Sequence, residues 1–122
     1  MAGKPFRGMV VLAELDPVAG HEQGKSRSCV IVQNDIGNRY ASTTVVVPLT
    51  DAVHISKPSP IYVLVKAGDG GTTKDSYVLC DQIRTVDQRR FRRIFGALAP
   101  ETMAAVDRAL LISLGLPILA AK

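Results

Sequence analysis

Residues 28–49 read SCVIVQNDIGNRYASTTVVVPL, and this stretch decides the class of fold. Two apolar runs rich in β-branched residues, at 28–33 and 43–49, flank a polar segment with the turn signals Asn-Asp and Gly-Asn. Continuous apolar runs of this length are typical of strands buried on both faces, and Val and Ile are favoured in strands. The stretch therefore predicts two strands joined by a turn within 34–41.

The same pattern continues on both sides of this stretch. Segments 8–15, 61–65 and 77–80 are short and apolar, and a final one follows at 94–98. Between the second and third lies GDGGTT (68–73), whose glycines tolerate the positive φ that a tight turn requires. We therefore expect five to seven short antiparallel strands separated by turns.

The C-terminal region has a different periodicity. Met103, Val106, Leu110 and Leu114 recur at helical spacing, Pro100 suits a first helical position, and Gly115 suits a helix end. This pattern predicts one helix over 101–114, with the apolar stripe in the core or in a dimer contact. Together the patterns predict a mainly β, α+β fold: one small barrel-like domain over residues 1–122 with a helical cap.

Composition limits the classes of function. The chain has 122 residues and a net charge of +4, with 15 Lys and Arg against 11 Asp and Glu. This excess of positive charge mildly favours a polyanionic partner. Apolar stretches fall short of the roughly 20 residues that a membrane-spanning helix needs, and no secretion signal opens the chain. We therefore expect a cytoplasmic protein with no membrane partner.

The cysteines and histidines do not indicate a metal site. Cys29 and Cys80 each lie within an apolar run, as expected for buried, reduced thiols. The two histidines, His21 and His54, are not spaced from a Cys or from each other as metal ligands are. We predict neither a structural metal nor a cofactor.

Three ordered stretches carry more specific information. They are RGMVVLAELDPVAG (7–20), GHEQGKSRSCVIVQNDIGNRYASTTVVVPLT (20–50) and KDSYVLCDQIRTVD (74–87). Taken together and in this order, they closely resemble the MazF/PemK (Kid) family of toxin endoribonucleases, over about residues 7–114. The resemblance implies an SH3-like β-barrel of the CcdB/PemK/MazF type with a C-terminal helix, assembled as a homodimer.

The resemblance also implies an activity and two partners. Members of the family cleave single-stranded RNA sequence-selectively without metal, and leave a 2′,3′-cyclic phosphate and a 5′-hydroxyl. A cognate, MazE-like antitoxin lays an acidic segment over the same groove. The expected function is therefore that of an mRNA interferase, the toxin of a toxin–antitoxin pair.

Two residues match the catalytic positions of the family. GKSR places Arg27 at the arginine of the GxRP motif, and Thr50 ends the VVVPLT segment at the family's catalytic threonine or serine. A guanidinium binds phosphate oxygens in a bidentate way and does not readily lose its proton, so Arg27 suits charge stabilisation, with proton donation as an alternative second role, rather than base catalysis. The Thr50 hydroxyl can donate to a non-bridging phosphate oxygen. Ser28 replaces the motif's proline and leaves the backbone beside Arg27 freer.

The sequence offers several candidates for the groups that transfer protons. His21 titrates near neutrality and suits an acid or a base, but it equally suits a solvated loop position. Glu22 is a candidate to accept the 2′-hydroxyl proton or to orient Arg27. Asp81 matches an acidic residue that is catalytic in PemK-type members; those members carry an arginine where this chain has Leu79, so a bracing role toward Arg84 is the alternative.

RNA contacts are expected mainly from loops, because aromatic residues are scarce and the chain has no Trp. The candidate RNA-binding residues are Gln23, Lys25, Asn34, His54, Ser56, Lys57 and Arg84. The arginine-rich segment 84–93 is also consistent with a solvated, charged face.

Two other functions are compatible with the same fold. One is a CcdB-like gyrase poison, although the GxxR, VPLT and DQIRT pieces belong to the RNase branch. The other is a catalytically inactive RNA-binding module, which the departures at Met9, Ser28 and Leu79 keep open.

Overall fold

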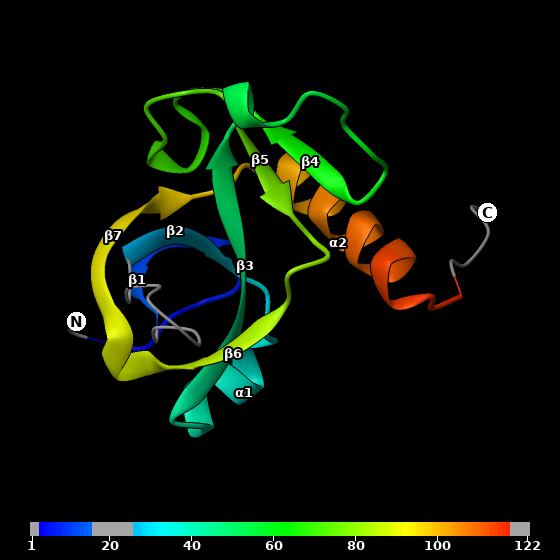
Figure 1. Ribbon diagram of the computed structural model, residues 1–122. Helices are drawn as coiled ribbons and strands as arrows, with labels where there is room; N and C mark the ends of the chain where they lie inside the picture. Colours follow the sequence, from blue (N-terminus) through cyan, green and yellow to red (C-terminus); the bar gives the residue numbers. More distant parts are fainter. Residues whose placement is uncertain (1–2, 16–25, 118–122) are drawn as a thin grey trace, which may run out of the picture.

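The structure is a computed structural model that describes residues 3–15 and 26–117 (Figure 1). Its strands are Met9–Glu14 (β1), Ser26–Ile31 (β2), Thr43–Asp51 (β3), Tyr62–Val65 (β4), Ser76–Leu79 (β5), Arg84–Asp87 (β6) and Phe91–Ala97 (β7). Its helices are Asp35–Tyr40 (α1) and Pro100–Leu114 (α2), with 3₁₀ turns at Ala52–His54 (η1), Asp69–Gly71 (η2) and Gln88–Arg90 (η3). The mainly β fold with a C-terminal helix is therefore confirmed.

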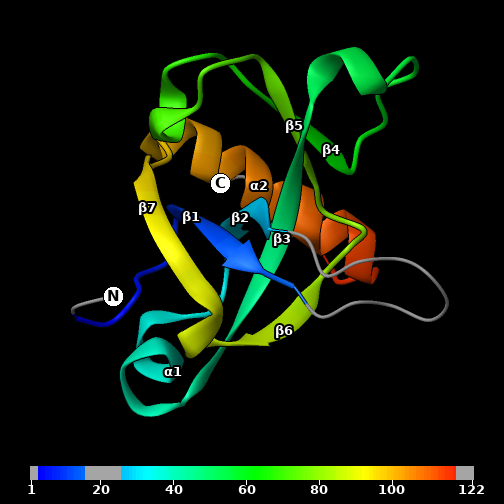
Figure 2. The ribbon, with the colours of Figure 1, turned by 60° about the vertical axis from the view of Figure 1, so that its left-hand side comes forward.

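The long strand β3 organises the sheet. The strand order is β4-β5-β3-β2-β1-β7, with β6 also paired to β3, and the pairings are antiparallel. The first part of β3 pairs with β6 and its last part with β5, so the sheet curls around this strand (Figures 1 and 2). The described strands form an open path with two ends, barrel-like in curvature but not closed.

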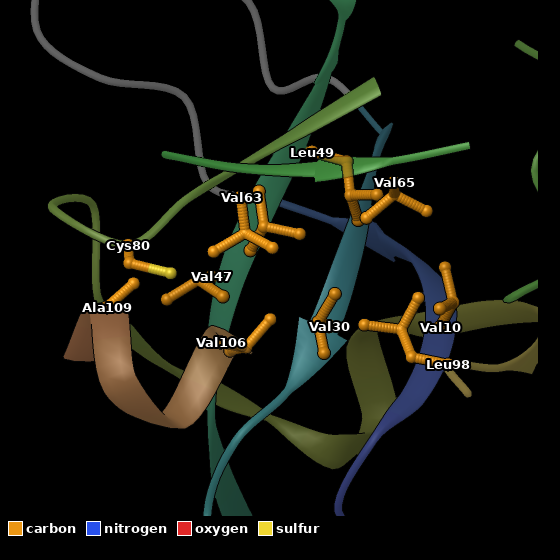
Figure 3. Packing of buried hydrophobic residues seen from close by; sticks show 11 residues of the cluster. Val10, Val30, Val47, Leu49, Val63, Val65, Cys80, Leu98, Val106 and Ala109 are labelled. Carbon is orange, nitrogen blue, oxygen red and sulfur yellow. The ribbon is translucent and has the colours of Figure 1, made fainter. Parts of the chain in front are cut away.

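The central strands β1, β2 and β3 are buried on both faces over much of their length, which explains their continuous apolar runs. Along β1, Val10 belongs to one hydrophobic cluster and Val11 to another, as the alternation of a strand requires. Val10 shares its cluster with Val106 and Ala109 of α2 (Figure 3). The Val11 cluster lies on the other face and includes Cys29 of β2.

The apolar stripe predicted for the C-terminal helix packs on the core at three of its four residues. Val106 is fully buried, and Met103 and Leu110 pack against the same cluster. Leu114 is 58% exposed in the single chain, so it does not pack in the core, and the alternative of a dimer contact stays a prediction for this residue. Ala109 is buried on α2 instead, because a small residue allows the helix to approach the sheet closely.

No helix among the described residues is both long enough and apolar enough to span a membrane.

The segment predicted as a turn at 34–41 contains the short helix α1. Asn34 caps this helix by accepting a hydrogen bond from the Gly37 backbone N–H at 2.7 Å. Behind it, the buried Asn38 amide oxygen accepts from the Thr44 hydroxyl at 2.5 Å. The Asn signals predict a turn here because a short helix and a turn share the same capping residues.

Both cysteines are buried and free, as predicted. Burial raises the pKa of the Cys29 thiol to about 11, although the nearby guanidinium groups of Arg27 and Arg84 act in the opposite direction. Burial, together with the charge of Asp81, raises the pKa of the Cys80 thiol to about 12. Both thiols therefore stay protonated in the folded protein at neutral pH.

These pKa values predict a loss of stability in alkali. Below pH 9 the thiols are protonated in both states, but above it the unfolded chain releases protons that the folded chain keeps. The free energy of unfolding should therefore fall by about 1 kcal/mol per pH unit per thiol as pH rises from 9 toward 11 or 12. Urea unfolding at several pH values measures this slope. A Cys29→Ala, Cys80→Ala variant should show a shallower slope, and an equal slope would contradict the assignment.

Candidate active site

The ends of β2 and β3 carry the two predicted catalytic residues. The last residue pair between these strands is Cys29 with Pro48. Arg27 lies two residues beyond this pair on β2, and Thr50 lies two residues beyond it on β3. Because side chains alternate along a strand and paired residues share a face, the Arg27 and Thr50 side chains belong to the same face. Adjoining strand ends thus bring both residues to one region of the sheet.

Arg27 is half-buried, and it pairs with Ala13 of β1 across the strand. Arg84 of β6 pairs with Val46 of β3, and the charges of Arg27 and Arg84 both lower the pKa of the Cys29 thiol against the effect of its burial. None of the carboxylates within the described residues forms an ion pair with Arg27. The region is therefore rich in positive charge, which suits an anionic ligand.

Thr50 has an aromatic neighbour that sequence reasoning did not single out. Tyr77 of β5 pairs with Thr50 across the strand, and its ring lies 6.5 Å from that of Tyr62, centroid to centroid. Both rings are half-buried. Aromatic side chains were expected to be sparse, yet Tyr77 lies beside the proposed catalytic threonine, and Tyr62 of β4 lies next to Tyr77.

A cleft of about 350 Å³ opens beside the same strand ends. Its walls come from β1–β3, from the η2–β5 connection and from β7; the lining residues are Val10, Ser28, Leu49, Thr50, Asp51, Gly71, Thr72, Thr73, Lys74, Ser76, Arg93 and Phe95. Arg27 does not line it, because Arg27 and Ser28 alternate along β2. Thr50 therefore borders the cleft and also stands on the face that carries Arg27.

Close backbone packing holds one wall of this cleft. Gly71 has φ +77°, and a Cβ there would lie 2.1 Å from the Phe95 carbonyl oxygen. Gly96 of β7 meets the same turn, where its Cβ would lie 3.0 Å from the Gly70 carbonyl carbon. Only glycine fits at Gly71, because both the positive φ and the contact exclude a side chain. The GDGGTT turn is thus pressed directly onto β7.

The charges of the cleft are unevenly paired. Lys74 forms an ion pair with Asp51 (Nζ to Oδ2, 3.5 Å), and Asp51 also accepts a hydrogen bond from the Val53 backbone N–H at 3.3 Å. Arg93 instead stacks over the Phe95 ring, with its guanidinium carbon 5.2 Å from the ring centroid. Among the described residues Arg93 has neither a hydrogen bond nor an ion pair.

The remaining predicted site residues are dispersed. His21, Glu22, Gln23 and Lys25 lie outside the described residues. Asp81 is exposed in the turn after β5, and in the described part of the chain it forms no ion pair with Arg84.

The predicted loop contacts do not reach the cleft. His54, Ser56 and Lys57 are exposed in and after η1, which directly follows β3, but they do not line the cleft. Asn34 caps α1, so its amide oxygen already has a structural role. Ser28, a departure from the family motif, lines the cleft, whereas the departures at Met9 and Leu79 are buried.

The arginine-rich segment 84–93 separates into different environments. Arg89 pairs with Asp87 at 3.0 Å and Arg92 with Glu14 at 3.2 Å, so these two belong to surface ion pairs. Arg93 faces the cleft. From this segment the sequence singles out Arg84 alone as a candidate RNA contact. Arg93 could not be distinguished by strand alternation, because two irregularities in the β1–β7 pairing break that alternation along β7.

Comparison with known proteins agrees with this arrangement. Residues 6–114 match the sequence model of a protein family, the PemK-like, MazF-like toxins of type II toxin–antitoxin systems. The chain belongs to this family. A curated relative, Endoribonuclease MazF of Staphylococcus epidermidis, is 44% identical over 110 residues, which cover 90% of this chain and 91% of the relative.

Solved structures of similar proteins have the same fold as this chain. An endoribonuclease from a mycobacterial species superposes with a TM-score of 0.78 at 27% identity, covering 96% of this chain and 97% of the other. A mycobacterial endoribonuclease in complex with its cognate antitoxin gives a TM-score of 0.76 at 28% identity, covering 94% of this chain and 99% of the other.

Within residues 3–15 and 26–117, no group of three His, Cys, Asp or Glu side chains is arranged to hold a metal ion.

Proposed function

We propose that this MazF-like chain is an endoribonuclease that cleaves single-stranded RNA with its own side chains and no metal cofactor. The observation that carries the proposal is the 44% identity to an endoribonuclease MazF over nine-tenths of the chain. The register of β2 and β3 supports it, because it brings Arg27 and Thr50 to one face at adjoining strand ends. We further propose that the enzyme acts as a homodimer in the cytoplasm.

The proposed chemistry is attack by a ribose 2′-hydroxyl on the adjacent phosphorus. The new 2′-oxygen–phosphorus bond forms as the bond from phosphorus to the 5′-oxygen breaks, which leaves a 2′,3′-cyclic phosphate and a 5′-hydroxyl. Negative charge builds on the phosphoryl oxygens, where the Arg27 guanidinium and the Thr50 hydroxyl donate hydrogen bonds. Arg27 keeps its proton throughout. Only a deprotonated guanidine could act as a base, and a guanidinium does not lose its proton at neutral pH.

Two protons must also move. One leaves the 2′-hydroxyl as the new bond forms, and one arrives at the departing 5′-oxygen. His21 and Glu22, from the segment that immediately precedes β2, are the proposed proton-transfer groups. Asp81 stands at the end of β5 and is the proposed third candidate, with Arg84 as a phosphate contact. Gln23, Lys25, Asn34, His54, Ser56 and Lys57 stay proposed RNA contacts.

We also propose that a cognate, MazE-like antitoxin inhibits the enzyme. A similar endoribonuclease has been solved with its cognate antitoxin, and this chain's net charge of +4 favours an acidic partner segment. The positive charge of Arg27 and Arg84 around Cys29 is where such a segment would compete with RNA.

The test is to incubate the purified protein with a long single-stranded RNA in excess EDTA. We expect cleavage at a small set of sites that primer extension locates. A DNA gyrase supercoiling assay with the same preparation serves as the control for the gyrase-poison alternative, and should show no inhibition. RNA that stays intact, with or without added Mg²⁺, would overturn the proposal.

A further inference from the structure

We propose that the cleft between β3, η2 and β7 is a nucleobase pocket, in which Arg93 binds one base of the RNA near the cut. This inference rests on the proposed function. It assigns a ligand to residues that neither the catalytic motif nor the expected loop contacts include.

Arg93 is the cation that is available for a ligand in this cleft. Its guanidinium carbon lies over the Phe95 ring, 5.2 Å from the centroid, and its donors are unused by any described residue. Lys74, the other cation, is already paired with Asp51. A guanidinium fixed by an aromatic ring loses little freedom on binding, and its fork donates to two acceptors on one edge of a base.

The cleft offers acceptors as well as donors, which favours a base over a phosphate. Phosphate oxygens only accept hydrogen bonds, so a site built for phosphate alone presents donors. Here the carboxylate of Asp51, which is paired with Lys74, lines the same space and places acceptor oxygens beside the donors. Every nucleobase carries both donors and acceptors on its edges. The half-buried Phe95 ring adds an apolar surface suited to a base, with the core residues Val10 and Leu49 behind it.

The size and place of the cleft fit this role. A volume of about 350 Å³ is near the lower end for small-molecule pockets, roughly 300–1,000 Å³, which suits one base or nucleotide rather than a longer segment. Thr50 borders it, so a strand whose phosphate lies at Thr50 can place a neighbouring base in it. The wall cannot recede there, because the Gly71 backbone rests directly against Phe95.

A titration of the full-length protein with nucleoside 5′-monophosphates, followed by the amide resonances of residues 71–74, tests the pocket without any cleavage. Inorganic phosphate is the control ligand. Arg93→Ala should abolish the shifts, whereas the matched variant Arg92→Ala should retain them. Arg92 carries the same charge on the same strand, but it is paired with Glu14 and does not line the cleft.

The cleavage assay gives the second readout. Among the sequences cut by the wild type, one position near the cut should show a base preference, and Arg93→Ala should lower that preference by about 10-fold or more. Arg92→Ala should preserve it. Equal shifts with inorganic phosphate, no shifts with any nucleotide, or an unchanged preference in Arg93→Ala would each overturn the pocket. If the wild type cleaves no RNA, the proposed function fails and the titration still decides whether the cleft binds a base.

Discussion

Arg27→Ala is expected to lower the rate of RNA cleavage at least about 100-fold, the scale seen when one donor to a developing oxyanion is removed. The charge on the phosphoryl oxygens grows as the 2′-oxygen attacks, so a donor fixed at that place stabilises the transition state more than the bound RNA. Arg27→Ala should therefore lower kcat far more than it raises KM. Single-turnover cleavage of a labelled oligonucleotide measures the effect.

Two variants separate this role from a general effect of charge. Arg27→Lys keeps the positive charge but not the planar fork, and should recover only part of the lost rate. Arg92→Ala removes an arginine from a surface ion pair with Glu14 and should cleave like the wild type. Circular dichroism confirms that each variant folds. Wild-type activity in a folded Arg27→Ala protein would remove Arg27 from the mechanism.

Local patterns predicted the strands β1 to β5, whose apolar runs are clear in the sequence, but they missed β6 and the first residues of β7, because the arginine-rich segment 84–93 contains no apolar run. The two runs in residues 28–49 became parts of β2 and β3, and the stripe around Val106 became the packed face of α2. The sequence patterns did not predict helix α1, because a helix of six residues is too short to show a periodicity and is specified by its capping side chain, Asn34.

The two proposed catalytic residues were found from a motif, and the strand register gives them a common face. The cleft could not be found in this way. Its walls come from residues near 28, 50, 72 and 93, and only the pairing of β7 with β1 and the contact between Gly71 and Phe95 bring them together. Arg93 carried no distinguishing signal, since it lies in a run of arginines of which two others form surface ion pairs.

The nucleophile itself can be removed from the RNA rather than from the protein. If the attack comes from a ribose 2′-hydroxyl, then one 2′-deoxyribose on the 5′ side of the cut bond should leave that bond intact. The leaving group and the phosphate are unchanged in such a substrate, and binding should be almost unaffected because the base and the charge are retained. The same replacement one nucleotide later, on the 3′ side of the cut, keeps the nucleophile and serves as the matched control.

The measurement is cleavage of these two oligonucleotides by the wild-type protein in EDTA, together with the all-RNA parent and analysis of the product ends. Side-chain catalysis around Arg27 and Thr50 predicts that the parent and the control are cut to a 2′,3′-cyclic phosphate and a 5′-hydroxyl, while the 5′-side deoxy substrate is not cut. Cleavage of that substrate, or a product with a 5′-phosphate, would show that water and not the 2′-hydroxyl attacks the phosphorus, and would contradict the mechanism.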